Sequence, residues 1–243
     1  MIEILNNIDT AIFLFFNGMH APFFDRFMML FTGRFIWIPM YAAILFLLIR
    51  SFGFKKAGIY IAAVALAITL TDQTCATLIR PLVERLRPSN LENPLSALTQ
   101  VVNDYRGGSY GFPSCHSANS FALATLISCL FRNRKMFLFI FGWAILNSYT
   151  RLYLGVHYPG DLLIGALIGS AYGYICYRLA RLLDMTSNIN SARQRLNHPL
   201  LNIPMGREWA GIGRATFTIT TGDLIIMVGT ITALLILAAS LLG

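Results

Sequence analysis

Three short clusters of arginine and histidine residues interrupt a chain that is otherwise rich in apolar side chains. They span Arg80–Pro88, Pro113–His116 and Arg151–Asp161, and each lies at the end of an apolar stretch. Charged side chains are costly in hydrocarbon, so proteins keep them at membrane depth mainly for function or anchoring. Arginine, histidine and aspartate side chains in combination suit chemistry on a phosphate group. The clusters therefore indicate phosphate chemistry at a membrane surface.

In the first cluster, Arg80, Glu84 and Arg87 are spaced at i, i+4 and i+7. On a continuous helix they share one face, and Pro88 then ends the helix. We therefore expect two guanidinium groups with an acidic partner between them. Guanidinium groups stay charged and bind phosphate oxygens in pairs. Anchoring of the chain at the membrane interface is the alternative role for this cluster on its own.

The second cluster, Pro113-Ser114-Cys115-His116, opens an apolar run. A proline is expected at the first position of such a helix. The free amide groups and the dipole of a helix start favour a bound anion. His116 then lies in the first turn, where it could donate a proton to an atom that leaves the phosphate. The alternative is a polar cap exposed to lipid headgroups.

The third cluster contains Arg151, His157 and Asp161, with a Pro159-Gly160 step between the last two. This step predicts a turn, which places His157 in a loop and Asp161 near a helix start. A carboxylate so close can accept a hydrogen bond from one imidazole nitrogen and leave the other as a nucleophilic lone pair. A helix cap is the alternative role for Asp161.

The composition places these clusters in a membrane protein. Of the 243 residues, 56% are hydrophobic and 12% are charged, and the mean hydropathy is +0.61, which excludes an ordinary soluble domain. The net charge of +8 comes from short loops between apolar runs, so anionic lipid headgroups are better partners than nucleic acid. The 4 cysteines lack the spacing of a zinc site or a disulfide framework, and we expect free thiols.

We predict an all-α, polytopic membrane helix bundle with about six transmembrane spans, because the apolar stretches approach the ~20 residues that cross a bilayer. These stretches are 34–49, 57–79, 113–131, 136–152, 159–179 and 223–242. The predicted organisation is an N-terminal interfacial segment, a membrane core, a cytoplasmic linker and an additional C-terminal span. Their ranges are 1–33, 34–182, 183–222 and 223–243.

The distribution of positive charge predicts the orientation of these spans. Counting lysines and arginines on alternate sides gives 12 on one face and 7 on the other, which together make the 19 present. The positive-inside rule assigns the richer face to the cytoplasm. Both chain ends and all three clusters then lie on the opposite, outer face. This segregation indicates that the clusters form a single site.

In order and spacing, the three clusters resemble the signature of the type 2 phosphatidic acid phosphatase superfamily. That signature is a lysine, six residues and Arg-Pro, then Pro-Ser-Gly-His, then Ser-Arg, five residues, His, three residues and Asp. The chain has Arg80, six residues and Arg87-Pro88, then Pro113-Ser114-Cys115-His116, then Thr150-Arg151, five residues, His157, three residues and Asp161. Arg80, Cys115 and Thr150 depart from the pattern, and none of the three removes a catalytic group.

The resemblance implies a role for each matched residue. His157 would attack phosphorus to give a phosphohistidine, Asp161 would orient it, and His116 would protonate the leaving oxygen. The phosphate-binding residues implied are Arg80, Arg87, Ser114, Cys115 through its amide, and Arg151. No metal and no other cofactor is implied, because arginines and helix amides supply the positive charge.

The leading hypothesis is an integral membrane lipid phosphatase in the bacterial inner (cytoplasmic) membrane, with residues 34–182 as its phosphatase core and the active site facing the periplasm. Among the substrates of the family, we favour lipid A phosphate and undecaprenyl pyrophosphate, with a slight preference for lipid A. A lipid-to-lipid phosphotransferase of the same family and a non-catalytic membrane scaffold are the alternatives. The loop 89–110, with Tyr105 and Arg106, is a candidate lid or headgroup contact.

Overall fold

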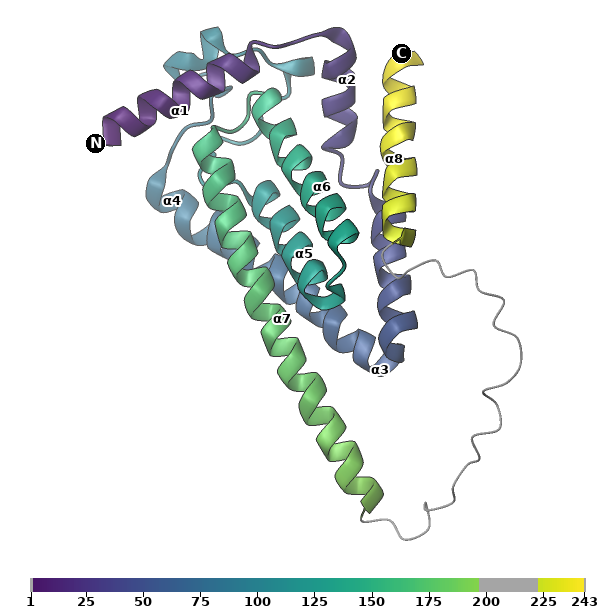
Figure 1. Ribbon diagram of the computed structural model, residues 1–243. Coiled ribbons are helices and arrows are strands. Elements are labelled where there is room, and N and C mark those ends of the chain that lie inside the picture. The colour runs from purple at the N-terminus through teal and green to yellow at the C-terminus, as the bar shows by residue number, and fades with distance from the viewer. Residues whose placement is uncertain (1, 197–222, 243) are drawn as a thin grey trace.

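The computed structural model describes residues 2–196 and 223–242, and these form an all-helical bundle without a β-strand (Figure 1). The predicted fold class is therefore confirmed. The α-helices are α1 (Ile2–Asn17), α2 (Pro22–Phe31), α3 (Ile38–Asp72), α4 (Arg80–Val83), α5 (Cys115–Phe131), α6 (Arg134–Tyr153), α7 (Pro159–Leu196) and α8 (Asp223–Leu242). A π-helical turn, η1 (Gln73–Ile79), joins α3 to α4, and two 3₁₀ turns, η2 (Pro94–Leu98) and η3 (Val102–Asp104), lie in the loop before α5.

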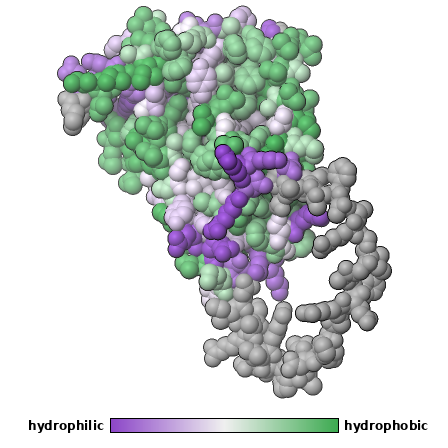
Figure 2. Space-filling model, in the orientation of Figure 1, coloured by the Kyte–Doolittle hydropathy of each residue, from purple (hydrophilic) through white to green (hydrophobic). Residues whose placement is uncertain are grey.

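Several helices have the length and composition of membrane spans. The stretches Ile38–Val83, Pro159–Thr186 and Asp223–Leu242 are long and apolar enough to cross a bilayer, and the shorter Cys115–Phe131 is apolar as well. The first stretch contains two predicted spans, because the chain changes direction at Gly53, whose φ of 73° interrupts the helix (Figure 1). Apolar side chains cover most of the upper part of the face seen in Figure 2. The count of six spans stays a prediction.

Helices α5 and α7 pack closely in the middle of the bundle, and glycines allow this. Gly165, Gly169 and Gly173 recur at every fourth position of α7. A Cβ atom on Gly169 would lie 2.0 Å from the carbonyl oxygen of Ala118 on α5, so the contact leaves no room for a side chain. Small residues at this spacing let membrane helices approach each other. The two helices run parallel, and their first turns therefore meet at the same end of the bundle.

The apolar core lies between α3, α5, α6, α7 and α8. At its edge, Trp37 packs edge-to-face against Phe31 and Trp143, and the indole N–H of Trp37 donates to the carbonyl oxygen of Phe31 at 2.9 Å. These contacts fix the turn between α2 and α3. That turn carries Thr32, which reaches the site described below.

Helix α1 crosses the end of the bundle at which α7 begins (Figure 1). Phe13 and Asn17 on its inner face are buried, and Asn17 donates to the carbonyl oxygens of Gln100 and Tyr153 at 3.0 and 2.9 Å. The opposite face exposes large apolar side chains, namely Ile4, Leu5, Ile8, Ile12 and Phe15. This two-sided helix fits the predicted interfacial segment, which stays a prediction.

In the C-terminal half, helix α7 extends into the segment predicted as a linker with a short surface helix. Helix α7 continues to Leu196, so the first part of the predicted linker 183–222 is helical. Residues 197–222 of that linker lie outside the described residues. Helix α8 coincides with the predicted final span and has the length and composition to cross a membrane. The four cysteines are free thiols, as predicted.

Candidate active site

The predicted site residues come together at one end of the bundle, which we call the site end. Arg80 begins α4, and Arg87 follows α4 in the loop. Arg151 lies near the end of α6, and His157 precedes α7. The remaining residues lie at the starts of α5 and α7, namely Ser114, Cys115, His116 and Asp161.

The imidazole of His157 is held from both sides. Its Nδ1 lies 3.3 Å from Oδ2 of Asp161, which also accepts the backbone N–H of Tyr158 at 3.0 Å. Its Nε2 lies 2.9 Å from Nη1 of Arg87, a group that can only donate. Nδ1 therefore carries the proton, and Nε2 carries the lone pair. This is the tautomer that a nucleophilic histidine needs.

Burial and positive charge keep this imidazole neutral. His157 is 2% exposed. Burial lowers the pKa of His157 well below its usual range, and the guanidinium groups of Arg87, Arg151 and Arg80 lower it further. Burial also lowers the pKa of Arg87 to about 10, with Arg151 and Arg80 contributing. At neutral pH, Arg87 therefore stays charged while His157 stays neutral.

Three arginines near the His157–Asp161 pair have hydrogen-bond donors without a partner. The Nε atoms of Arg80, Arg87 and Arg151 are buried and have no partner among the described residues. Arg87 and Arg151 are only 7% and 8% exposed. A buried donor without a protein partner is costly, so such groups bind water, an ion or a ligand. An anion with several oxygens, such as a phosphate, fits these donors.

Arg151 links the site to two other parts of the chain. Its Nη1 donates to Oγ1 of Thr32 at 3.0 Å, and its Nη2 donates to the hydroxyl of Tyr105 at 2.9 Å. Tyr105 belongs to the loop that the sequence suggested as a lid or headgroup contact. Arg106 in the same loop instead donates to Asp104 and to the carbonyl oxygen of Ser89. Tyr105 thus reaches the site, whereas Arg106 closes the loop on itself.

The start of α5 differs slightly from the sequence expectation. The helix begins at Cys115, with Ser114 as its cap, so the prediction that Pro113 occupies the first helical position is wrong. Oγ of Ser114 accepts the N–H of Ser117 at 3.4 Å. The N–H of Ser114 donates to the carbonyl oxygen of Asp161 at 3.0 Å, which ties α5 to the start of α7. His116 lies in the first turn, as predicted.

Two departures from the family signature contact each other. Nη2 of Arg80 donates to the carbonyl oxygen of Pro113 at 3.2 Å and to Sγ of Cys115 at 3.0 Å. A lysine would supply a point donor at this position, whereas the guanidinium fork reaches both acceptors. The Cys115 side chain is therefore accommodated beside Arg80.

The helical face predicted for the first cluster is wrong. Helix α4 ends at Val83, and Glu84 is exposed with a left-handed φ of 48°. Arg87 instead lies in an extended segment, where its N–H donates to the carbonyl oxygen of Ser109 at 3.0 Å. This pairing requires the chain to leave the helix before Arg87. The acidic partner near the arginines is Asp161, not Glu84.

His116 is oriented by a residue that the sequence did not single out. Its Nε2 lies 3.1 Å from Oδ1 of Asn147 and 3.5 Å from Oγ1 of Thr32. Nδ2 of Asn147 donates to Oγ of Ser120 at 2.8 Å, which turns Oδ1 toward His116. Nε2 of His116 therefore donates to Asn147. A buried asparagine inside a predicted span is the signal that could have revealed it.

Two further residues, Arg85 and Gly111, contact Asp161 without having been predicted, and Asp9 reaches it through Arg85. Arg85 donates from Nη1 to Oδ1 of Asp161 at 2.9 Å and from Nη2 to Oδ2 of Asp9 at 2.7 Å. A Cβ atom on Gly111 would lie 3.0 Å from Oδ2 of Asp161, so the loop backbone packs directly on the carboxylate. Arg85 and Gly111 lie within or next to the predicted clusters. Nothing in the sequence around Asp9 points to this site.

A family model described as the PAP2 superfamily matches residues 56–183, a range that contains all the predicted site residues. The chain belongs to the PAP2 superfamily. It is 50% identical over 222 residues to a lipid A 4'-phosphatase of Bacteroides thetaiotaomicron, with 91% of this chain and 93% of the relative covered. It is 32% identical over 177 residues to a lipid A 4'-phosphatase of Porphyromonas gingivalis, with 73% and 75% covered.

A solved structure supports the same assignment. The crystal structure of Aquifex aeolicus LpxE aligns with a TM-score of 0.51 and 25% sequence identity, covering 70% of this chain and 94% of that chain. The resemblance drawn from the three clusters is thus confirmed, and so is the prediction of an enzyme of the phosphatase class. The PAP2 match leaves α1, α2 and α8 outside its range.

Proposed function

We propose that this PAP2 protein removes a phosphate group from lipid A through a phosphohistidine formed on His157. The observation that carries the proposal is the neutral imidazole of His157, whose Nε2 lone pair contacts Arg87, together with the unpaired Nε donors of Arg80, Arg87 and Arg151, whose charges act on this ring. Such a pocket binds a phosphate next to a nucleophile. The names of the two relatives reported above support lipid A as the substrate.

In the proposed first step, phosphate oxygens bind the donors of Arg80, Arg87 and Arg151, and Nη1 of Arg87 moves from Nε2 of His157 to the phosphate. Nε2 attacks phosphorus, and the bond from phosphorus to the sugar oxygen breaks. His116 gives a proton to that oxygen, which leaves as an alcohol. Asp161 accepts the Nδ1–H of His157 and stabilises the positive charge that forms on the ring.

In the proposed second step, a water molecule attacks the phosphohistidine. His116 takes a proton from the water, the N–P bond breaks, and inorganic phosphate leaves. The arginines and the amide of Cys115 stabilise the charge on the equatorial oxygens in both steps. Ser114 is fully buried as the cap of α5, and its hydroxyl hydrogen is free to donate to a phosphate oxygen.

The proposed location is the bacterial inner membrane, with the site facing the periplasm. The charge count along the sequence supports this orientation. In the structure, the turn around Gly53 and the turn between α5 and α6 both lie away from the site end, and they carry the basic residues Arg50, Lys55, Lys56, Arg132, Arg134 and Lys135. The more basic end is therefore opposite the site.

Phosphate release from purified protein tests the function. Wild type, His157→Ala and His20→Asn would be assayed on lipid A and on undecaprenyl pyrophosphate with a chelator present. Wild type should release phosphate from lipid A, and His157→Ala should lose about 10⁴-fold or more of the rate. His20 contacts Asp25 outside the site, so His20→Asn should retain the rate.

Two results would contradict the proposal. Substantial turnover by His157→Ala would exclude its nucleophilic role, and a preference for undecaprenyl pyrophosphate would exclude lipid A as the main substrate. Lipid A labelled in its phosphate separates hydrolysis from transfer. Label in free phosphate supports the phosphatase, whereas label in a second lipid supports the phosphotransferase.

A further inference from the structure

The guanidinium group of Arg85 is shared between two carboxylates from distant parts of the chain. It donates to Oδ1 of Asp161 at 2.9 Å and to Oδ2 of Asp9 at 2.7 Å. The other oxygen of Asp9 accepts the N–H of Gly160 at 2.7 Å. Asp9 thus holds both Arg85 and the residue next to Asp161. The contacts form a closed ring of α1, the segment after α4, and the start of α7.

This ring determines how Asp161 can lie. The carboxylate is fully buried, with Oδ1 held by Arg85 and Oδ2 shared by His157 and the N–H of Tyr158. With Oδ1 fixed, Oδ2 keeps its direction toward Nδ1 of His157. Removing one partner of a buried ion pair leaves an uncompensated charge, which is strongly unfavourable. Without Arg85, the carboxylate would take up a proton or rotate toward another donor.

The surroundings are shaped for these contacts. The guanidinium group of Arg85 stacks 3.8 Å above the ring of Tyr158, which limits its movement. A Cβ atom on Gly160 would lie 3.0 Å from Oδ2 of Asp9, so the contact between α1 and this turn depends on the absence of a side chain there. The side chains of Arg85 and Asp9 are 21% and 14% exposed, so water screens the pair only in part.

We propose that Arg85 and Asp9 are positioning residues for the reaction, which hold Asp161 ionised and directed at His157 and so make helix α1 part of the active site. The proposal rests on the nucleophilic role of His157 proposed above. It extends the site beyond residues 56–183, the range matched by the family model, because Asp9 lies on α1.

A purely structural role for the ion pair predicts different kinetics. If Arg85 and Asp9 only attach α1 to the bundle, their loss should lower stability and leave the kinetics of the folded molecules unchanged. If they position Asp161, their loss should lower kcat with little change in KM, because Asp161 acts on the nucleophile and not on the bound lipid. The split between kcat and KM therefore separates the two roles.

The experiment uses the purified full chain and whichever phosphorylated lipid the wild type hydrolyses. Arg85→Met should lower kcat by about 10²-fold and change KM less than about threefold. Arg85→Lys, which keeps the charge without the fork, should recover part of the loss. Asp9→Asn should lower kcat by about 10-fold, because Arg85 keeps Asp161 but loses its second anchor. Arg178→Met, at an exposed arginine of α7, is the matched control and should retain full activity.

The pH profile gives a second readout. The groups that face Asp161 are Arg85 and Arg87 from the loop after α4, His157 and the N–H of Tyr158 from the turn before α7, and, through Arg85, Asp9 from α1. Removing the positive charge of Arg85 makes the carboxylate easier to protonate. The acid limb of kcat should therefore move to higher pH in Arg85→Met and stay in place in Arg178→Met.

The controls keep the outcomes distinct. His157→Ala is assayed in parallel, and activity in that variant would remove the proposed function itself. If His157→Ala is inactive while Arg85→Met keeps kcat within about twofold of wild type, only the positioning role is overturned. If Arg85→Met does not fold, Arg85→Lys and Asp9→Asn decide. Both should show reduced kcat with unchanged KM, and wild-type kcat in both would overturn the proposal.

Discussion

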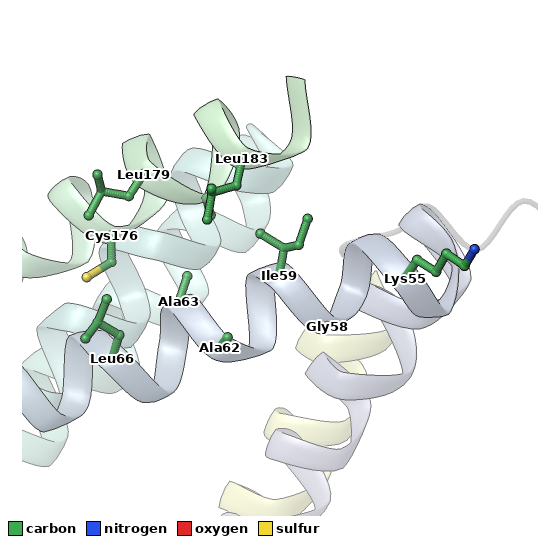
Figure 3. A pocket seen from close by; sticks show the side chains of 10 residues that line it. Lys55, Gly58, Ile59, Ala62, Ala63, Leu66, Cys176, Leu179 and Leu183 are labelled. Atoms are coloured by element: carbon green, nitrogen blue, oxygen red, sulfur yellow. The ribbon is translucent and has the colours of Figure 1, made fainter. Parts of the chain in front are cut away.

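The two ends of the bundle bury different kinds of groups. The site end buries charged and polar side chains, among them Arg87, Arg151, His157 and Asp161. Farther along the bundle, side chains of α3 and α7 line an open apolar pocket of about 430 Å³ (Figure 3). Leu66, Leu179 and Leu183 line it, and Lys55 lies at its edge. Asp184, which follows the lining residue Leu183, is buried and pairs with Lys56 at 3.0 Å.

Buried charge distinguishes the candidate active site from this apolar pocket. The pocket between α3 and α7 is lined almost entirely by apolar side chains, and its reactive groups are the thiol of Cys176 and the amine of Lys55 at its edge. Apolar pockets between helices cost little in a membrane, whereas buried charges cost several kcal/mol unless they are paired. The several buried charges at one end therefore support the candidate active site proposed there.

Among the tests of this comparison, the largest effect is expected when one charged residue at each end is replaced by methionine. Arg87→Met removes the donor to Nε2 of His157 and a predicted phosphate contact, so kcat/KM should fall by about 10³-fold. Lys56→Met breaks the pair with Asp184 and should lower thermal stability while activity stays within about twofold of wild type. Phosphate release and thermal unfolding of both variants check this. An equal loss of activity in both would show that the two ends are coupled.

A smaller effect is expected when the contact between α5 and α7 is disturbed. This contact brings together the site residues at the starts of the two helices. In Gly169→Ala the new Cβ would overlap the backbone of Ala118, so the helices must separate, at a cost of about 1–3 kcal/mol. We expect a lower unfolding temperature and about 10-fold less activity, since the starts of α5 and α7 shift apart. Gly142→Ala on α6, where a Cβ would meet nothing within 4 Å, is the matched control.

Gly142→Ala should be neutral or slightly stabilising, because alanine favours a helix over glycine by about 1 kcal/mol. Equal destabilisation of both glycine variants would contradict the close contact of α5 and α7. Unfolding temperatures and rates of phosphate release, measured on the same preparations, decide between these results.

The smallest expected effect is that of pH on the wild type. A histidine with a lowered pKa stays neutral until the pH falls below that pKa, so its lone pair persists through the range in which an ordinary histidine becomes protonated. Between pH 8 and about 6, kcat should therefore change less than about twofold. A fall in kcat centred near pH 6.5 would contradict the lowered pKa of His157. The same profile for Arg87→Met should show an acid limb at higher pH, because one of the charges that lower the pKa of His157 is gone.

Part of this site was accessible from the sequence because its chemistry is encoded in short spacings. His157 and Asp161 are separated by one helical turn, so their pairing across the Pro159-Gly160 turn could be predicted. The position of His116 in the first turn of an apolar helix followed from the same local reasoning. The prediction that Arg80, Glu84 and Arg87 share one helical face is wrong, because pairing with residues 109–111 draws the chain out of the helix after Val83.

The sequence by itself determined that the chain is an all-helical membrane protein with a phosphatase signature, because composition and local spacing depend on nearby residues alone. Only the tertiary structure decided which charges meet. Asp9 lies 76 residues from Arg85 and 151 residues from Gly160, and Arg85 lies 76 residues from Asp161. Contacts over such separations depend on how the helices pack, and here the glycines of α7 and the docking of α1 bring the partners together.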